Sequence, residues 1–183
     1  MYQDRANQIT PKIIPHLKIG KVLDIGCGTG AIARTIKKKK KVQFTLVDVT
    51  FNPMCDIFPV MIYDGRKLPF PNKSFDNCLL ITVLHHSNTP QEVLDEAIRV
   101  TSGRIIVIED IFSDLFSRII TFLGDCLVNW EIHSPFLNHS LKEWISIFSS
   151  KGLKINYVEE FNLKCVGLSF KLGVFVLDQK SKD

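Results

Sequence analysis

Apolar residues occur along this chain in short runs rich in Val, Ile and Phe, and longer stretches with helical spacing separate these runs. Continuous apolar runs are typical of parallel strands that are buried on both faces. The predicted strands cover residues 21–25, 43–48, 60–63, 77–83, 104–109, 153–159 and 169–177. The predicted helices cover residues 3–16, 30–39, 91–100, 111–128 and 141–150. This alternation predicts an α/β sandwich, with helices on both faces of one sheet.

Turn residues support these boundaries. Thr89 and Pro90 suit the cap and the first position of a helix, and Gly152 follows the last periodic residue of another helix. Segment 68–72 contains two prolines and is predicted to be a loop. A length of 183 residues without repeats or linkers fits one domain, so we expect a single domain over residues 1–183.

Charge and cysteine content narrow the classes of protein. The net charge is +4, and the excess lies in the lysine run 37–41, which we interpret as a solvated helix end; nucleic acid is therefore not an expected partner. No apolar stretch is long enough for a membrane span, because charges interrupt the best candidate at 111–130. An odd number of dispersed cysteines suggests neither disulfides nor a metal site and favours the reducing cytoplasm. They are Cys27, Cys55, Cys78, Cys126 and Cys165.

The strongest chemical signal is segment 22–30, Val-Leu-Asp-Ile-Gly-Cys-Gly-Thr-Gly, in which a buried strand runs into three alternate glycines. Glycines let the backbone turn tightly and let a ligand approach closely. Gly26, Gly28 and Ala31 also satisfy the G-x-G-x-x-A pattern of dinucleotide-binding folds. Asp48, at the end of the second predicted strand, can accept hydrogen bonds from ribose hydroxyls in either case. The glycine pattern alone leaves both interpretations open.

Segment 22–30 resembles the first motif of class I S-adenosylmethionine (SAM)-dependent methyltransferases. Segment 61–76 resembles the third-strand motif of the members related to ubiquinone and menaquinone biosynthesis. The same pattern continues in order at 83–86, 96–100 and 103–107. The resemblance implies a Rossmann-like, seven-stranded, mostly parallel sheet of order 3-2-1-4-5-7-6 with an antiparallel last strand. Thr101-Ser102-Gly103 is shorter than the family's Pro-Gly-Gly loop, so we expect an altered turn there.

The resemblance implies SAM as cofactor, S-adenosylhomocysteine as product, and methyl transfer as the activity. It assigns Asp24 and the glycine turn to the methionine end, Asp48 to the ribose, and Asp64 with Gly65 to the adenine. Thr82 and Val83 should flank the methionine near the sulfonium. The implied cofactor residues are Asp24, Gly26, Cys27, Gly28, Thr29, Gly30, Asp48, Val49, Asp64, Gly65, Thr82 and Val83. An ordinary turn residue is the alternative interpretation of Asp64.

Two histidines follow the fourth predicted strand, beside the expected methyl donor. In-line methyl transfer needs a base only where the acceptor must lose a proton, and His86 and His85 are the candidates, with His86 preferred. Histidines that only hydrogen-bond the loop are the alternative. Glu109 and Asp110 follow the fifth strand and could also reach the acceptor side, although surface solvation is the simpler expectation. No metal is predicted, because ligand spacing is lacking among His85, His86, His133 and His139.

The segment at about 111–137 is rich in Phe, Leu and Ile and is predicted to be a helical, lid-like insertion. In the resembling family this position commonly covers the acceptor. The amino-terminal segment, with Tyr2, Arg5 and Ile9, could likewise close over the cofactor. An apolar segment there hints at a small acceptor of apolar or aromatic character, although packing against the domain explains it equally well. The alternative function is a non-catalytic module of the same fold that binds the cofactor or a partner protein. The sequence leaves both a monomer and a homodimer open.

Overall fold

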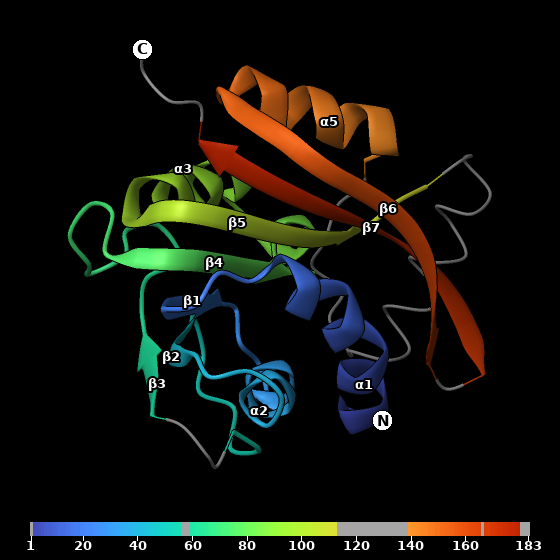
Figure 1. Cartoon of the computed structure of the whole chain (residues 1–183), viewed down its shortest axis with the longest axis horizontal. Coiled ribbons are helices and arrows are strands. Elements are labelled where there is room, and N and C mark those ends of the chain that lie inside the picture. The colour runs from blue at the N-terminus through green and yellow to red at the C-terminus, as the bar shows by residue number, and fades with distance from the viewer. Residues whose placement is uncertain (1, 56–58, 113–138, 166, 180–183) are drawn as a thin grey trace.

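A computed structural model describes residues 2–55, 59–112, 139–165 and 167–179 (Figure 1). Seven strands form one sheet of order β3-β2-β1-β4-β5-β7-β6. Strands β1 to β5 are parallel, and β7 is antiparallel to both of its neighbours. The strands are β1 (Lys21–Ile25), β2 (Gln43–Asp48), β3 (Val60–Ile62), β4 (Phe75–Ile81), β5 (Thr101–Asp110), β6 (Leu153–Cys165) and β7 (Leu168–Gln179). The predicted fold class and strand order are confirmed.

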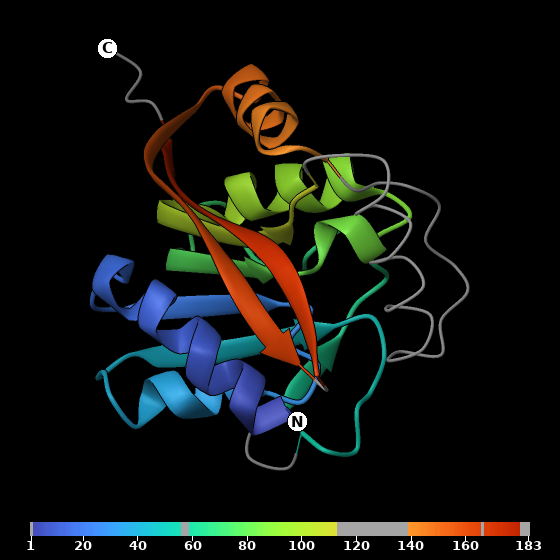
Figure 2. The same cartoon turned by 90° about the vertical axis from the view of Figure 1, so that its right-hand side faces the viewer.

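Helices cover both faces of the sheet, as Figures 1 and 2 show. One face is covered by α1 (Tyr2–Ile13) and α2 (Ala31–Lys37), the other by α3 (Pro90–Val100) and α5 (Leu141–Ser150). Two short 3-10 helices, η1 (Ile14–His16) and η2 (Leu84–His86), follow α1 and β4. The predicted helix 111–128 and lid 111–137 lie outside the described residues, apart from their first two positions.

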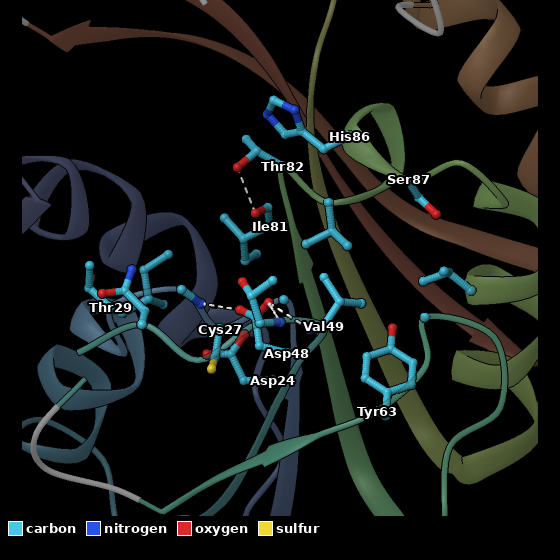
Figure 3. Close-up of a pocket in the computed structure, with 18 of the residues that line it drawn as sticks. Asp24, Cys27, Thr29, Asp48, Val49, Tyr63, Ile81, Thr82, His86 and Ser87 are labelled. Carbon is cyan, nitrogen blue, oxygen red and sulfur yellow. Dashed lines mark hydrogen bonds between the residues drawn. The ribbon is translucent and has the colours of Figure 1, made fainter. Parts of the chain in front are cut away.

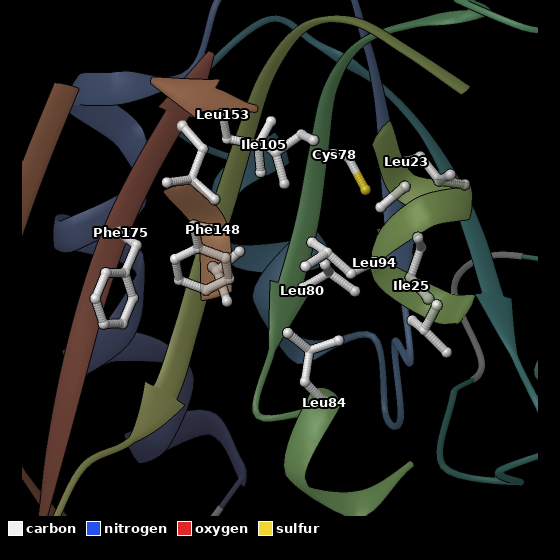
Figure 4. Packing of buried hydrophobic residues seen from close by; sticks show 14 of the residues in the cluster. Leu23, Ile25, Cys78, Leu80, Leu84, Leu94, Ile105, Phe148, Leu153 and Phe175 are labelled. Carbon is white, nitrogen blue, oxygen red and sulfur yellow. The ribbon is translucent and has the colours of Figure 1, made fainter. Parts of the chain in front are cut away.

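The core lies in two layers because the sheet is buried on both faces. Side chains of β5 alternate between these layers, and the four central residues Ile105, Ile106, Val107 and Ile108 are all fully buried. On the α3 and α5 face, Phe148 packs edge-on against Phe175 with ring centroids 5.1 Å apart (Figure 4). This double burial explains why the strands read as continuous apolar runs rather than as alternating patterns.

Local sequence signals account for the helix boundaries. Ser140 and Glu143 form a capping box at the start of α5, and Gly152 with φ 74° follows its end. Pro90 occupies the first turn of α3 and Thr89 the cap position, as predicted, but the Thr89 side chain makes no capping hydrogen bond. Helix α3 leads directly into β5, so the shortened loop expected at 101–103 has no turn at all.

Several strand boundaries differ from the prediction. Strand β4 ends at Ile81, two residues early, because Thr82 adopts φ 55° and donates its N–H to the Ile108 carbonyl. Strands β6 and β7 extend into a long hairpin that reaches α1 (Figure 2). There Lys12 pairs with Glu159 at 2.5 Å, so the hairpin and α1 support each other.

The junction between α3 and β5 generates a stability prediction. A Cβ on Gly103 would lie 2.3 Å from the backbone oxygen of Asp76 in the neighbouring strand, and backbone cannot move aside easily. We expect Gly103→Ala to lower the free energy of unfolding by about 2 kcal/mol or more. Urea denaturation measures the change, with Ser146→Ala on the exposed face of α5 as a neutral control. Unaltered stability of Gly103→Ala would contradict this packing of β4 against β5.

Candidate functional site

A cavity of about 980 Å³ opens at the carboxyl ends of the parallel strands. It lies where the strand order reverses between β1 and β4, the position at which open α/β sheets bind ligands. Most of the predicted site residues meet here. The predicted residues that line the cavity are Asp24, Gly26, Cys27, Gly28, Thr29, Asp48, Val49, Asp64, Gly65, Thr82, Val83 and His86. Gly30 and His85 are the two that do not line it.

The turn after β1 forms one wall. Gly26 has φ 69° and packs so closely against Val83 that a Cβ would lie 2.6 Å from that side chain. A Cβ on Gly28, in contrast, would meet no atom within 4 Å, because Gly28 faces open space. The Gly28 N–H donates to Oδ2 of Asp48 at 2.8 Å, so β2 holds the turn in place. The turn is therefore a bare stretch of backbone over which a ligand can lie.

Two carboxyl groups lie at the base of the cavity, side by side in Figure 3. Asp24 is only 3% exposed, and burial, followed by the charge of Asp48, raises the pKa of its carboxyl to about 7. Asp48, at the end of β2, accepts the N–H of Val49 at 2.8 Å through Oδ1. Such a pair attracts hydroxyl donors and cationic groups, and a cation beside Asp24 would relieve the cost of its burial.

The far end of the cavity is formed by residues after β3. Asp64 accepts the N–H groups of Arg66 and Lys67, each at 2.9 Å, and these hydrogen bonds lower the pKa of its carboxyl. Asp64 is thus a turn residue that also lines the cavity, so the two interpretations of this residue are compatible. Tyr63, which the sequence analysis missed, stands half-buried beside it, and burial raises the pKa of its phenol to about 12. Its position directly before Asp64 was the available signal.

The third wall follows β4 and separates the two histidines. His85 is buried; its Nδ1 contacts Oε2 of Glu109, and its Nε2 lies 3.4 Å from Oδ2 of Asp110. Glu109 also accepts the N–H groups of Val83 at 3.0 Å and Leu84 at 2.8 Å. The expectation that Glu109 and Asp110 are solvated at the surface is wrong, since they are only 0% and 7% exposed. These hydrogen bonds hold Glu109 inside the protein, and Asp110 lies beside His85.

His86 points into the cavity, near Thr82 (Figure 3). Partial desolvation, with a further contribution from His85, lowers the pKa of His86 to about 4. Its imidazole is therefore neutral at physiological pH and can accept a hydrogen bond from a ligand. Arg5 of α1, which belongs to the amino-terminal segment that the sequence suggested could close over the cofactor, lines the cavity and donates a hydrogen bond to the Thr82 hydroxyl. Nothing local in the sequence indicates this contact, since 76 residues separate the two.

The described part of the chain contains neither a cluster of metal ligands nor a helix suited to spanning a membrane. No group of three or more His, Cys, Asp or Glu residues there is placed to hold a metal ion. His133, one of the four histidines considered above, lies outside that part. Among the described helices, none combines the length and apolar character that crossing a membrane requires.

Comparisons with known proteins agree with this geometry. The sequence profile of a family described as a methyltransferase domain matches residues 23–107. The uncharacterised protein MJ1123 of Methanocaldococcus jannaschii is 30% identical over 161 residues, covering 85% of this chain and 72% of that protein. The ubiquinone/menaquinone biosynthesis C-methyltransferase UbiE of Laribacter hongkongensis is 34% identical over 103 residues, covering 49% of this chain and 42% of UbiE. The chain thus matches less than half the length of this curated relative.

A solved structure shows the same fold. The crystal structure of a putative methyltransferase from Bacillus halodurans aligns with a TM-score of 0.74 at 12% identity, over 95% of this chain and 98% of that one. The fold is the class I, Rossmann-like methyltransferase fold. It is recognised by the order of the sheet, by the glycine turn and by the acidic residues at the strand ends around the cavity. The chain belongs to the SAM-dependent methyltransferases of the type related to UbiE. Family and fold imply SAM as cofactor, which decides against the dinucleotide interpretation of the glycine turn.

The buried carboxyl of Asp24 generates a prediction on stability. Its folded-state pKa of about 7 lies above the unfolded value of 3.8, so the folded protein binds this proton more tightly and stability falls as the pH rises through that window. We expect Asp24→Asn to be more stable than the wild type at pH 8, by up to about 4 kcal/mol, with a smaller difference at pH 5. Urea denaturation at both pH values measures this.

The exposed, ion-paired Asp95 provides the control, because Asp95→Asn should change stability little at either pH. If Asp24→Asn is destabilised equally at pH 5 and pH 8, the Asp24 carboxyl is required as a structural hydrogen-bond acceptor and the prediction is wrong.

Proposed function

We propose that the cavity binds SAM and that the protein transfers its methyl group in line to a small-molecule acceptor. The open space over Gly28, between the carboxyl of Asp48 and the turn at Asp64, is the observation that supports this most directly. A side chain at Gly28 would fill that space, and glycine leaves it free. A cavity of about 980 Å³ lies at the upper end of ligand-site volumes, so it has room for a cofactor and an acceptor together.

The residues present fit the chemical groups of the cofactor. Asp48 offers acceptor oxygens to ribose hydroxyls, and Asp64 with the Gly65 N–H suits the donor and acceptor edge of adenine. Val49 and Tyr63 supply apolar surface around that end of the cavity. The turn 26–30 and Asp24 would hold the methionine end. This arrangement supports a cofactor-binding role for eleven of the twelve residues that the resemblance implies. The exception is Gly30, whose role is conformational, because it precedes α2 with φ 67°.

When bound, the cofactor would supply a methyl group attached to a sulfonium. Loss of that methyl group leaves a neutral thioether. The protein's share of the reaction is to align the acceptor with that methyl group and to exclude water. Thr82 and Val83 shape the wall at this point, and His86 stands beside them. A neutral His86 accepts a hydrogen bond from an acceptor O–H or N–H and so orients its lone pair; its lowered pKa suits orientation better than full proton abstraction.

His85 has a different role in this proposal. It is buried on Glu109 and fixes the turn that presents His86, so it supports the site without touching the acceptor. Among the described residues, the wall around His86 includes Ser87, Asn88 and Thr89, so polar groups are available to bind an acceptor. We also propose an acceptor of apolar or aromatic character. The apolar composition of segment 111–137 is the one observation that supports this character. The cysteines at 27, 55, 78 and 165 form no disulfide among the described residues, which agrees with the cytoplasmic location that we propose.

The alternative is a non-catalytic module that keeps the cofactor site and binds a partner protein. Both functions predict binding of S-adenosylhomocysteine, and turnover separates them. Transfer of labelled methyl groups from SAM to any member of a panel of phenols, quinols and amines supports the enzyme. Binding without turnover across that panel, together with a partner that co-purifies in fixed ratio, supports the module.

The glycine turn provides a matched pair of variants. Gly28 and Gly152 both have positive φ, at 52° and 74°, and a Cβ at either would meet no atom within 4 Å. The backbone strain of an alanine is therefore similar, but only Gly28 lines the cavity. We expect Gly28→Ala to weaken S-adenosylhomocysteine binding by about tenfold or more and Gly152→Ala to leave it unchanged. Isothermal titration calorimetry measures both. Equal affinities for the two variants, or no binding by the wild type, would overturn the proposed cofactor site.

His86 provides a kinetic prediction. We expect His86→Asn to lower kcat by about 100-fold with an unchanged dissociation constant for S-adenosylhomocysteine. Because the pKa of His86 is about 4, the wild-type rate should not fall between pH 8 and pH 6 and should decline only below about pH 5. The measurement is the pH profile of methyl transfer to an acceptor found in the panel. A rate that declines around pH 6.5 in the wild type would contradict a neutral, partly desolvated His86.

A further inference from the structure

Arg5 enters the cavity from outside the sheet. It lies on α1, whose position is fixed by the buried residues Ile9 and Ile13 and by a hydrogen bond from Gln3 to the Thr35 hydroxyl of α2 at 3.0 Å. From there the Arg5 side chain reaches across the cavity wall and donates to the hydroxyl of Thr82 at the end of β4. The helix therefore holds a positive charge against the end of the sheet.

The fold does not use the full hydrogen-bonding capacity of this side chain. A guanidinium has five N–H donors, and Nε of Arg5 is buried without a hydrogen-bond partner among the described residues. A buried donor that lacks a partner costs free energy, so its retention indicates a ligand that supplies an acceptor. Thr82, which accepts the hydrogen bond from Arg5, has a strained backbone, since φ 55° is unfavourable for a β-branched residue.

The charges along the cavity place this donor at one end. The described lining contains two arginines, Arg5 and Arg66. Arg66 follows Asp64 at the adenine end, has a 70% exposed side chain and lies 3.8 Å from Glu92. Arg5 lies by Thr82, next to Val83, which packs on Gly26 of the turn. Arg5 is thus the cation at the end assigned to the amino-acid part of the cofactor, where the buried Asp24 supplies the opposite charge.

We infer that Arg5 binds the carboxylate of the cofactor's amino-acid group, while Asp24 faces its ammonium. The amino-acid group is a zwitterion, and a buried carboxyl with a guanidinium across the same end of the cavity matches both of its charges. Arginine suits this role because its planar donors can bind a carboxylate at two points. The inference rests on the proposed function, and it makes α1 a part of the cofactor site.

Three ligands separate the carboxylate from the rest of the cofactor. S-adenosylhomocysteine has the whole amino-acid group, its decarboxylated analogue keeps the ammonium alone, and 5′-methylthioadenosine has neither group. We expect Arg5→Gln to weaken S-adenosylhomocysteine by about 10- to 100-fold and to leave the other two affinities unchanged. Arg5→Lys, which keeps the charge without the planar fork, should have an intermediate effect. Calorimetric titration of each variant with each ligand measures these shifts.

Lys12 is the matched control, because it is a cation on the same helix that pairs with Glu159 outside the cavity. Lys12→Gln should leave all three affinities unchanged, and circular dichroism melting checks that each variant is folded. The inference is overturned if Arg5→Gln and Arg5→Lys lose affinity equally for all three ligands, or lose no affinity for any of them. It is also overturned if the only effect is on the KM of an anionic acceptor. If the wild type binds 5′-methylthioadenosine and S-adenosylhomocysteine equally, the inference fails while the adenosine site stands. If it binds none of the three, the proposed function fails as well.

Discussion

The buried carboxylate of Glu109 organises the side of the candidate site that follows β4. It stands at the end of β5, fully enclosed, and accepts the N–H groups of Val83 and Leu84 as well as a contact from the His85 ring. These partners lie in the turn that follows β4, so one side chain fixes where that turn begins and how it bends. Because a buried carboxylate without partners is very costly, each of these contacts is strongly favoured over water. The positions of Thr82 and His86 depend on this arrangement.

On the opposite side of the cavity, a carboxylate holds the glycine turn in a similar way. Asp48, at the end of β2, accepts the N–H of Gly28, and Gly26 packs directly against Val83 of the turn after β4. A carboxylate from a neighbouring strand thus holds each of the two turns, and the two turns touch each other. The backbone of the glycine turn is positioned by strands of the sheet rather than by its own flexible residues. Such rigid support is what a binding site needs if its groups are to be in place before the ligand arrives.

The pattern of apolar residues predicted the strands because its signal is strong and local: the central strands contain short apolar runs, and glycines and prolines mark several of their ends. The resemblance to the methyltransferase family indicated which residues surround the cavity, since its motifs lie where parallel strands end at one edge of the sheet. What the sequence could not give was contacts between distant segments. Glu109 looks like a surface residue until His85 and two backbone N–H groups are brought to it, and the contact of Arg5 with Thr82 forms only when α1 is packed on the sheet. Contacts between distant segments leave no periodic pattern in the sequence.

Three polar groups around the cavity are held in costly states. Burial disfavours the ionised form of Asp24, Nε of Arg5 has no described hydrogen-bond partner, and partial desolvation disfavours the charged form of His86. A ligand that supplies an ammonium group, a carboxylate and a hydrogen-bond donor would relieve these three costs. A protein optimised for stability alone would replace these residues, because apolar or solvated alternatives cost less. Arg5 and His86 lie beside Thr82, which is itself strained, and so mark the part of the cavity where binding and chemistry are proposed to meet.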